Sequence, residues 1–195
     1  EGVEMNFGVN DENIGKYAIK SFVAATKALK EGFVDVLVTA PINKYNIQSD
    51  NFKFPGHTDY LDQELEGNAL MLMVQDGLRV GLLTDHIPLN EVASHLTEEL
   101  IIKKIETIKQ TIIQDFSINK PKIAVLGLNP HCGDGGVIGK EEDAVLKPTL
   151  KKIFDKGTLV FGPFAADGFF GSNQYDKYDA IIATYHDQGL IPFKT

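Results

Sequence analysis

The sequence of 195 residues contains no tryptophan and one cysteine, Cys132. A single cysteine cannot form a disulfide within the chain, which fits a reducing compartment such as the cytoplasm. No apolar run approaches the roughly 20 residues that a membrane-spanning helix needs. The first residues also lack the charged and apolar regions of a signal peptide. These absences predict a cytoplasmic protein that does not interact with a membrane.

Positive charge is scarce as well. Nineteen Lys and Arg residues stand against 27 Asp and Glu residues, for a formal net charge of -8. Because no basic stripe or patch is present, nucleic acid is not an expected partner. The chain has no initiator methionine and no terminating pattern at Phe193-Lys194-Thr195. We therefore expect a piece of a longer protein.

Hydrophobic residues, 43% of the chain, recur with the periods of alternating helices and strands. The expected helices cover about 12–31, 58–66, 97–116 and 140–156. The first is capped by Asn10-Asp11 and followed by Gly32, the third is capped by Thr97, and Pro148 kinks or splits the last. The expected strands cover 34–39, 69–75, 78–84, 122–128, 159–161 and 179–184. The pattern indicates an α/β fold with helices on both faces of the sheet.

The sheet is expected to be mixed, because Asp76-Gly77 joins two apolar runs and is a strong hairpin signal. Three histidines follow expected strands: His86 follows 78–84, His131 follows 122–128 and His186 follows 179–184. Ligands of an open α/β sheet gather outside the carboxyl ends of its strands. Three imidazoles with an open position form a common catalytic metal shell. Their placement predicts a shared site.

Each motif also has a simpler interpretation. A histidine after a strand can serve only as a hydrogen-bonding cap, and the glycine-rich loop 133–136 can be a tight turn rather than an anion cradle. That loop is neither a Walker loop nor a dinucleotide fingerprint. Cys132 is a metal-ligand or nucleophile candidate but more simply a bystander. Asp187 can orient His186, transfer protons or be a solvated acid, and His95 is interpreted as structural or exposed.

Four segments resemble the signature segments of the 4-hydroxythreonine-4-phosphate dehydrogenase family of pyridoxal phosphate biosynthesis. They occur in the family's order and spacing, and the resemblance covers essentially the whole chain. The segments are Gly56-His57-Thr58-Asp59, Thr84-Asp85-His86-Ile87-Pro88-Leu89, Leu128-Asn129-Pro130-His131-Cys132-Gly133 and Tyr185-His186-Asp187-Gln188-Gly189-Leu190. The resemblance implies the isocitrate/isopropylmalate dehydrogenase-like fold, which has three layers with a mixed sheet between helices.

The resemblance implies an oxidoreductase that uses NAD and a metal ion to oxidise and decarboxylate 4-hydroxythreonine 4-phosphate (4-phosphooxy-threonine). The family's metal-ligand histidines match His86, His131 and His186. These side chains would hold a divalent ion such as zinc, magnesium, manganese or cobalt. The implied substrate is a small phosphorylated hydroxy acid.

The resemblance also implies roles around that ion. His57 and Thr58 match the substrate-binding pair, and Lys194 matches the phosphate-binding lysine. Asp167 matches an aspartate implicated in proton transfer. Asp167, Asp187 and His57 are the catalytic candidates, and the sequence does not assign the acid and the base among them.

The family's active site lies at a dimer interface, which implies a homodimer with a shared site. His186, Asp187 and Lys194 would then serve the partner's site. We expect residues 1–195 to be the central part of a two-domain α/β dehydrogenase, with its internal boundary unassigned. The family's opening Pro-Gly-Glu-Pro-Ala-Gly-Ile-Gly segment and its C-terminal part, with the remaining substrate-binding Asn and Arg and much of the NAD contact, are absent. Cofactor-binding residues are therefore not assigned.

Three alternatives stay open from the sequence. The substrate can be a related phosphorylated four-carbon acid, such as phosphothreonate or phosphoerythronate. A metal-dependent hydrolase would use the same three-histidine shell without nicotinamide. The chain can also be an inactive piece that binds metal without turning over a substrate.

Overall fold

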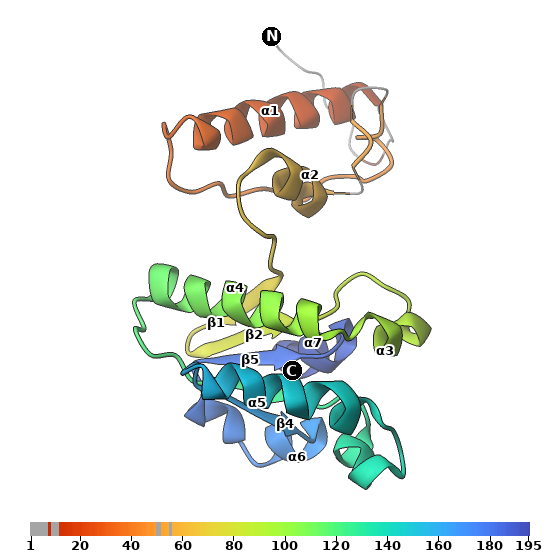
Figure 1. Ribbon diagram of the computed structural model, residues 1–195. Coiled ribbons are helices and arrows are strands. Elements are labelled where there is room, and N and C mark those ends of the chain that lie inside the picture. The colour runs from red at the N-terminus through yellow and green to blue at the C-terminus, as the bar shows by residue number, and fades with distance from the viewer. Residues whose placement is uncertain (1–7, 9–11, 50–51, 55) are drawn as a thin grey trace. The chain divides into compact units, whose positions relative to one another are not determined.

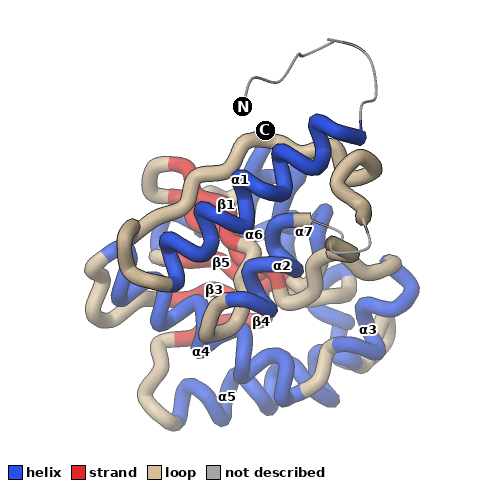
Figure 2. The backbone as a smooth tube through the Cα atoms, turned by 90° about the horizontal axis from the view of Figure 1, so that it is seen from above, coloured by secondary structure: helices blue, strands red, loops and turns tan. Residues whose placement is uncertain are grey.

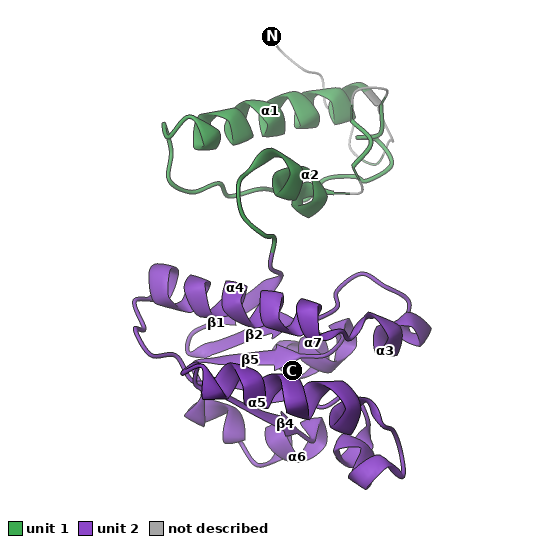
Figure 3. Ribbon diagram, viewed as in Figure 1, with its two compact units in different colours: residues 1–69 green, residues 70–195 purple. Residues whose placement is uncertain are grey.

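The computed structural model describes residues 8, 12–49, 52–54 and 56–195, which form two compact units. The first unit spans residues 1–69 and the second spans residues 70–195 (Figure 3). The first contains α1 (Glu12–Lys30) and α2 (His57–Glu64). Its core consists of four buried side chains, Phe22, Ile47, Phe52 and Tyr60.

Helix α1 ends as its sequence predicts. The backbone N–H of Phe33 donates to the carbonyl of Ala28 at 2.9 Å, and Gly32 takes a φ of 74°. Glycine adopts this left-handed conformation without the steric cost that a side chain would add. The expected cap at Asn10-Asp11 lies outside the described residues.

The second unit is built on a five-stranded sheet with the order β1-β2-β5-β3-β4 (Figure 1). Strand β1 runs antiparallel to β2, and the remaining three pairs are parallel. Asp76 turns the hairpin with a φ of 50°, and Gln75 pairs with Leu78 across it. The mixed sheet is thus confirmed. The strands are β1 (Leu72–Gln75), β2 (Leu78–Leu82), β3 (Ile123–Leu126), β4 (Val160–Phe164) and β5 (Ala180–Ala183).

Helices cover both faces of this sheet. Ile123 and Val125 of β3 belong to the core cluster of α4 (Glu98–Phe116) and α5 (Lys147–Asp155). Ala124 and Leu126 belong to the cluster of α6 (Ala166–Gly171) and α7 (His186–Lys194). Successive strand residues point to opposite faces, so the alternation identifies three layers. Figure 2 shows β1, β5, β3 and β4 one after another in red.

The remaining described helical segments are short. They are the 3₁₀ helices Leu89–Glu91, Pro130–Gly136 and Gln174–Lys177, the helix α3 (Val92–His95) and the π-helix Glu142–Leu146. The predicted helix over 140–156 is in fact split between this π-helix and α5. The helical backbone continues from the π-helix into α5, and Pro148 lies directly after this change, where the ring removes one backbone donor from the helix. None of the described helices is long and apolar enough to cross a membrane.

Helix α4 follows its sequence pattern at both the cap and the buried face. The Thr97 side chain accepts a hydrogen bond from the backbone N–H of Leu100 at 3.2 Å. This bond satisfies one of the free donors at the helix start. The predicted isoleucine stripe is fully buried against the sheet and consists of Ile101, Ile105, Ile108 and Ile112.

The predicted strand over 34–39 is wrong. This segment is irregular, and Val36 and Val38 are 73% and 90% exposed. Apolar, β-branched composition favours a strand but supplies no hydrogen-bonding partner, and no strand longer than a single bridge is present among the described residues of the first unit. Composition alone therefore misled the prediction.

The α4 stripe gives a matched pair of substitutions. Ile108 is fully buried, and a Cβ built on Gly81 of β2 would lie only 3.0 Å from its Cδ1. Ile108→Ala should lower the free energy of unfolding by about 2–5 kcal/mol through lost burial and a cavity. Ile102→Ala makes the same change at a position that is 37% exposed and should cost well under half as much. Urea unfolding measures both, and equal losses would contradict this packing.

Candidate active site

Hydrogen bonds tie together the carboxyl ends of the four parallel strands. The Thr84 hydroxyl donates to the carbonyl of Thr184 at 2.7 Å, and the Thr184 hydroxyl oxygen lies 3.4 Å from the carbonyl oxygen of Gly127. The backbone N–H of Gly127 donates to the carbonyl of Phe164 at 2.8 Å. Both threonines are buried. The ends of β2, β5, β3 and β4 are thereby held at one edge.

The sequence candidates leave the sheet at this edge in the order of the strands. His86 follows β2, His186 begins α7 after β5, His131 follows β3, and Asp167 lies in α6 after β4. The expectation that the three histidines follow strands of one sheet is confirmed. Such an edge is where α/β proteins bind ligands.

His86 and His186 face one another across neighbouring strands. Their ring centroids lie 5.7 Å apart. The Asp85 side chain accepts the backbone N–H of His86 at 2.8 Å, which fixes the start of that loop. The two imidazoles line a cavity of about 300 Å³, here called the histidine pocket, with Asp85, Ile87, Leu89, Val92, Tyr185 and Asp187.

Asp187 orients the His186 ring. Its Oδ1 lies 2.7 Å from Nδ1 of His186. The other ring nitrogen, Nε2, takes no part in this bond and is the atom that could bind an ion. Metal-binding histidines commonly use one nitrogen for the ion and the other for a carboxylate. The donor chemistry of the His86–His186 pair therefore fits a divalent ion that accepts imidazole ligands.

His131 and Asp167 line an adjacent cavity of about 340 Å³, here called the loop pocket. Tyr185 borders both pockets, so the two cavities share a wall. Within the described part of the chain, no group of three His, Cys, Asp or Glu side chains is arranged to hold a metal ion. The three-histidine site thus stays a prediction. The other residues of the loop pocket are Gly127, Leu128, Asn129, Pro130, Ala166 and Gln188.

The loop that carries His131 has several consecutive residues in the left-handed backbone conformation. His131 and Cys132 both have a φ of 52°, Asp134 has a φ of 44°, and Gly133, Gly135 and Gly136 also have positive φ. A left-handed residue with a side chain costs roughly 1–2 kcal/mol. Such conformations persist only where the surroundings impose them.

The buried carboxylate of Glu142 holds the left-handed loop in place. Glu142 is fully buried, and its Oε1 accepts the backbone N–H of Asn129 at 2.7 Å. The Asn129 side-chain amide donates to Glu142 at 2.9 Å and to Glu141 at 2.7 Å. A Cβ on Gly139 would come within 2.1 Å of the Asn129 amide nitrogen, so the loop has no spare room. Sequence reasoning missed Glu142; its only signal was the acidic run Glu141-Glu142-Asp143 after the glycine-rich loop.

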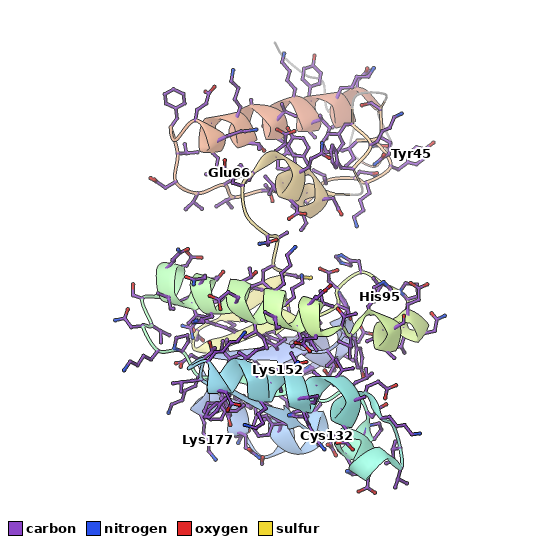
Figure 4. All side chains as sticks on the ribbon, viewed as in Figure 1. Tyr45, Glu66, His95, Cys132, Lys152 and Lys177 are labelled. Atoms are coloured by element: carbon purple, nitrogen blue, oxygen red, sulfur yellow. The ribbon has the colours of Figure 1, made fainter. Side chains whose placement is uncertain are left out.

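Cys132 lies in the segment between β3 and α5 (labelled in Figure 4). Burial raises the pKa of its thiol, and the nearby Glu142 charge raises this pKa further. The thiol also donates to the carbonyl of Pro163 at 3.5 Å. A protonated, hydrogen-bonded thiol is a poor nucleophile and metal ligand, in agreement with the interpretation of Cys132 as a bystander.

Lys194 is not close to the histidines within one chain. It lies at the opposite end of α7 from His186, roughly 12 Å away along the helix axis at 1.5 Å per residue. Its neighbours Phe193 and Thr195 line a cavity at the β1–β2 turn, where Asp76 also lies. Its phosphate-binding role stays a prediction.

His57 and Thr58 begin α2 in the first unit. Gly56 is the N-cap, so Thr58 is not a cap residue. The His57 ring packs edge-on against Phe22 with centroids 4.8 Å apart. His95, at the end of α3, is exposed, and its Nδ1 lies 2.8 Å from the carbonyl of Glu91, in agreement with a structural interpretation (Figure 4).

Glu142 provides a test of how the His131 loop is held. Glu142→Gln replaces one acceptor oxygen with an N–H₂ group that faces the donors of Asn129. We expect it to lower the free energy of unfolding by about 1–3 kcal/mol, because buried donors lose their acceptor. Asp143→Asn, on the exposed side of the same helix, should change it by less than about 1 kcal/mol. Thermal unfolding of both variants measures these changes. If Glu142→Gln leaves the stability unchanged, Glu142 does not hold the His131 loop.

Solved structures with the same fold come from several bacteria. A 4-hydroxythreonine-4-phosphate dehydrogenase from Klebsiella pneumoniae superimposes with a TM-score of 0.87 at 31% identity, over 97% of this chain and 57% of that one. A terephthalate 1,2-cis-dihydrodiol dehydrogenase from Burkholderia xenovorans gives 0.71 at 27% identity, over 97% and 60%. The three-layer, isocitrate/isopropylmalate dehydrogenase-like fold is thereby confirmed.

The sequence comparisons agree. The curated 4-hydroxythreonine-4-phosphate dehydrogenase of Bacteroides thetaiotaomicron is 48% identical over 98% of this chain and 53% of its own length. That of a Sulfurihydrogenibium species is 41% identical over 98% and 59%. The chain thus spans a little more than half the length of these relatives. The model of the pyridoxal phosphate biosynthetic protein PdxA matches residues 1–195, and the chain therefore belongs to that family.

Proposed function

We propose that this chain carries part of the active site of a dehydrogenase that uses NAD and a divalent metal ion to oxidise and decarboxylate 4-hydroxythreonine 4-phosphate in pyridoxal phosphate biosynthesis. The observation that carries the proposal is the His86–His186 pair, with Asp187 on one ring, at the carboxyl edge of the sheet. The names of the relatives support a dehydrogenase that acts on 4-hydroxythreonine 4-phosphate, whereas NAD, the metal ion and the loss of CO₂ rest on the family resemblance.

His86 and His186 would hold the ion, with His131 from the adjacent loop pocket as the third ligand. A divalent ion supplies Lewis acidity, which eases loss of the alcohol proton and polarises the ketone before CO₂ leaves. The third ligand requires a shift of the loop or a contribution from a partner subunit. A homodimer with a shared site, in which His186, Asp187 and Lys194 serve the partner, is the alternative arrangement: there His86 and His186 of one chain would belong to different sites, and subunit mixing distinguishes the two arrangements.

The geometry favours a division of labour between the two aspartates. Asp187 is engaged with the His186 ring and orients it. Asp167 instead lines the loop pocket beside His131. We assign proton transfer to Asp167, with His57 as the second candidate. His57, Thr58 and Lys194 bind the substrate, and Lys194 meets its phosphate as a point charge.

Metal binding by the 195-residue chain tests the ligand assignment. Isothermal titration with Zn²⁺ or Co²⁺ should find one site per chain, and His86→Ala and His186→Ala should each weaken it by more than about tenfold. His95→Ala is the matched control, because His95 is exposed on α3 and its Nδ1 lies 2.8 Å from the Glu91 carbonyl, away from the histidine pocket. Unchanged affinity in the His86 and His186 variants would remove them from the shell.

Subunit mixing decides whether the ligands come from two chains. The full-length Bacteroides thetaiotaomicron relative is prepared with the substitutions that correspond to His86→Ala and His186→Ala, each inactive alone. In a shared site, a mixed dimer places both substitutions in one site and leaves the other intact. Activity should then return after mixing. If none returns although mixed dimers form, both histidines serve the same chain's site.

The dehydrogenase assay separates the reaction classes. NADH formation by the full-length relative from 4-hydroxythreonine 4-phosphate, phosphothreonate and phosphoerythronate ranks the substrates, and hydrolysis without NAD reduction would favour the hydrolase. Hydride transfer needs the reacting carbons held about 3–3.5 Å apart. Because the chain spans only a little more than half the length of its relatives, we expect it to form no NADH by itself. Turnover by this chain at the relative's rate would place the nicotinamide site within residues 1–195.

A further inference from the structure

Gln188 uses both ends of its side-chain amide. Its Oε1 accepts the backbone N–H of Thr184 at 2.7 Å and the Thr184 hydroxyl at 2.9 Å. Its Nε2 donates to the carbonyl of Gly127 at 2.6 Å. The amide therefore spans two strand ends, because Thr184 follows β5 and Gly127 follows β3.

These bonds fix the first turn of α7, in which His186 lies two residues before Gln188. The next residue holds the same turn by a different contact. A Cβ on Gly189 would lie 2.9 Å from Leu82 Cδ2 and 3.1 Å from Ala183 Cβ, so the backbone of α7 rests directly on β2 and β5. Hydrogen bonds at Gln188 and close packing at Gly189 together leave this turn little freedom.

From this arrangement we infer that Gln188 is a positioning residue for metal binding and acts through His186. It sets the place of the His186 imidazole relative to the ends of β5 and β3, from which the His131 loop also departs. This role rests on the metal site of the proposed function. Gln188 itself touches neither His186 nor, by this proposal, the ion.

The chemistry of the two contacts selects glutamine at this position. A glutamate would keep an acceptor toward Thr184 but would turn a second acceptor oxygen toward the Gly127 carbonyl at 2.6 Å. A methionine has a similar length and loses both kinds of bond. Gln188→Glu therefore breaks the link to β3 alone, whereas Gln188→Met breaks the links to both strands.

Titration of the 195-residue chain with Co²⁺, followed by its visible absorption, tests the inference. We expect both Gln188 variants to bind Co²⁺ about tenfold more weakly than the wild type and to shift its absorption bands, because the ligand geometry changes. Ile112→Val is the control. Ile112 is fully buried on α4, one turn before Phe116, whose ring packs under Arg79 near the amino end of β2. It should lower the unfolding temperature and leave Co²⁺ affinity and spectrum unchanged.

The outcomes separate the two proposals. Folded Gln188 variants that bind Co²⁺ with wild-type affinity and spectrum would overturn the role of Gln188 while the metal site stands. A wild-type chain with no Co²⁺ site, or one that His86→Ala and His186→Ala leave unaltered, would overturn the metal site and the Gln188 role with it. Should neither variant fold, proton exchange of the Gln188 side-chain amide is measured in the wild type with and without Co²⁺. Slower exchange with Co²⁺ supports the coupling, and identical exchange contradicts it.

Discussion

The structure depends on the hydrogen bonds that run from strand to strand beyond the end of the regular sheet. Where the strands have stopped pairing, Thr84 and Gly127 continue the ladder with a hydroxyl or a backbone group, and the Gln188 amide joins Thr184 to Gly127. Buried polar groups are costly when unpaired and rigid when paired. The same bonds that satisfy these groups therefore set the starting points of the loops that carry the candidate site.

Two kinds of loop leave this edge. The segments after β2 and β5 are short and bring His86 and His186 together directly. The segment after β3 is long and left-handed, and the buried Glu142 holds it through Asn129. Tyr185 forms the wall between the two resulting cavities. Precise placement of reactive side chains needs supporting contacts of this kind, and here each loop has its own.

Local signals in the sequence predicted what depends on neighbours in the chain. Asp76-Gly77 identified the hairpin, Thr97 the start of α4, and the isoleucines at 101, 105, 108 and 112 its buried face. The strand over 34–39 failed because pairing requires a second strand that composition does not reveal. The strand-end positions of the three histidines were predictable, since each follows an apolar run. The roles of Gln188 and Glu142 were not, because their partners lie 61 and 13 residues away.

The order of the strands also has a kinetic consequence. Strand β5 is the last of the five in the chain, yet it lies between β2 and β3, which are not paired with each other. The Arg79 guanidinium, at the start of β2, donates a hydrogen bond to the carbonyl of Asp179, which lies 100 residues later in the chain. Contacts of such long sequence separation form slowly, because the intervening chain must first be ordered. During synthesis, the edge that collects the three histidines can close only after nearly all of the described chain has emerged.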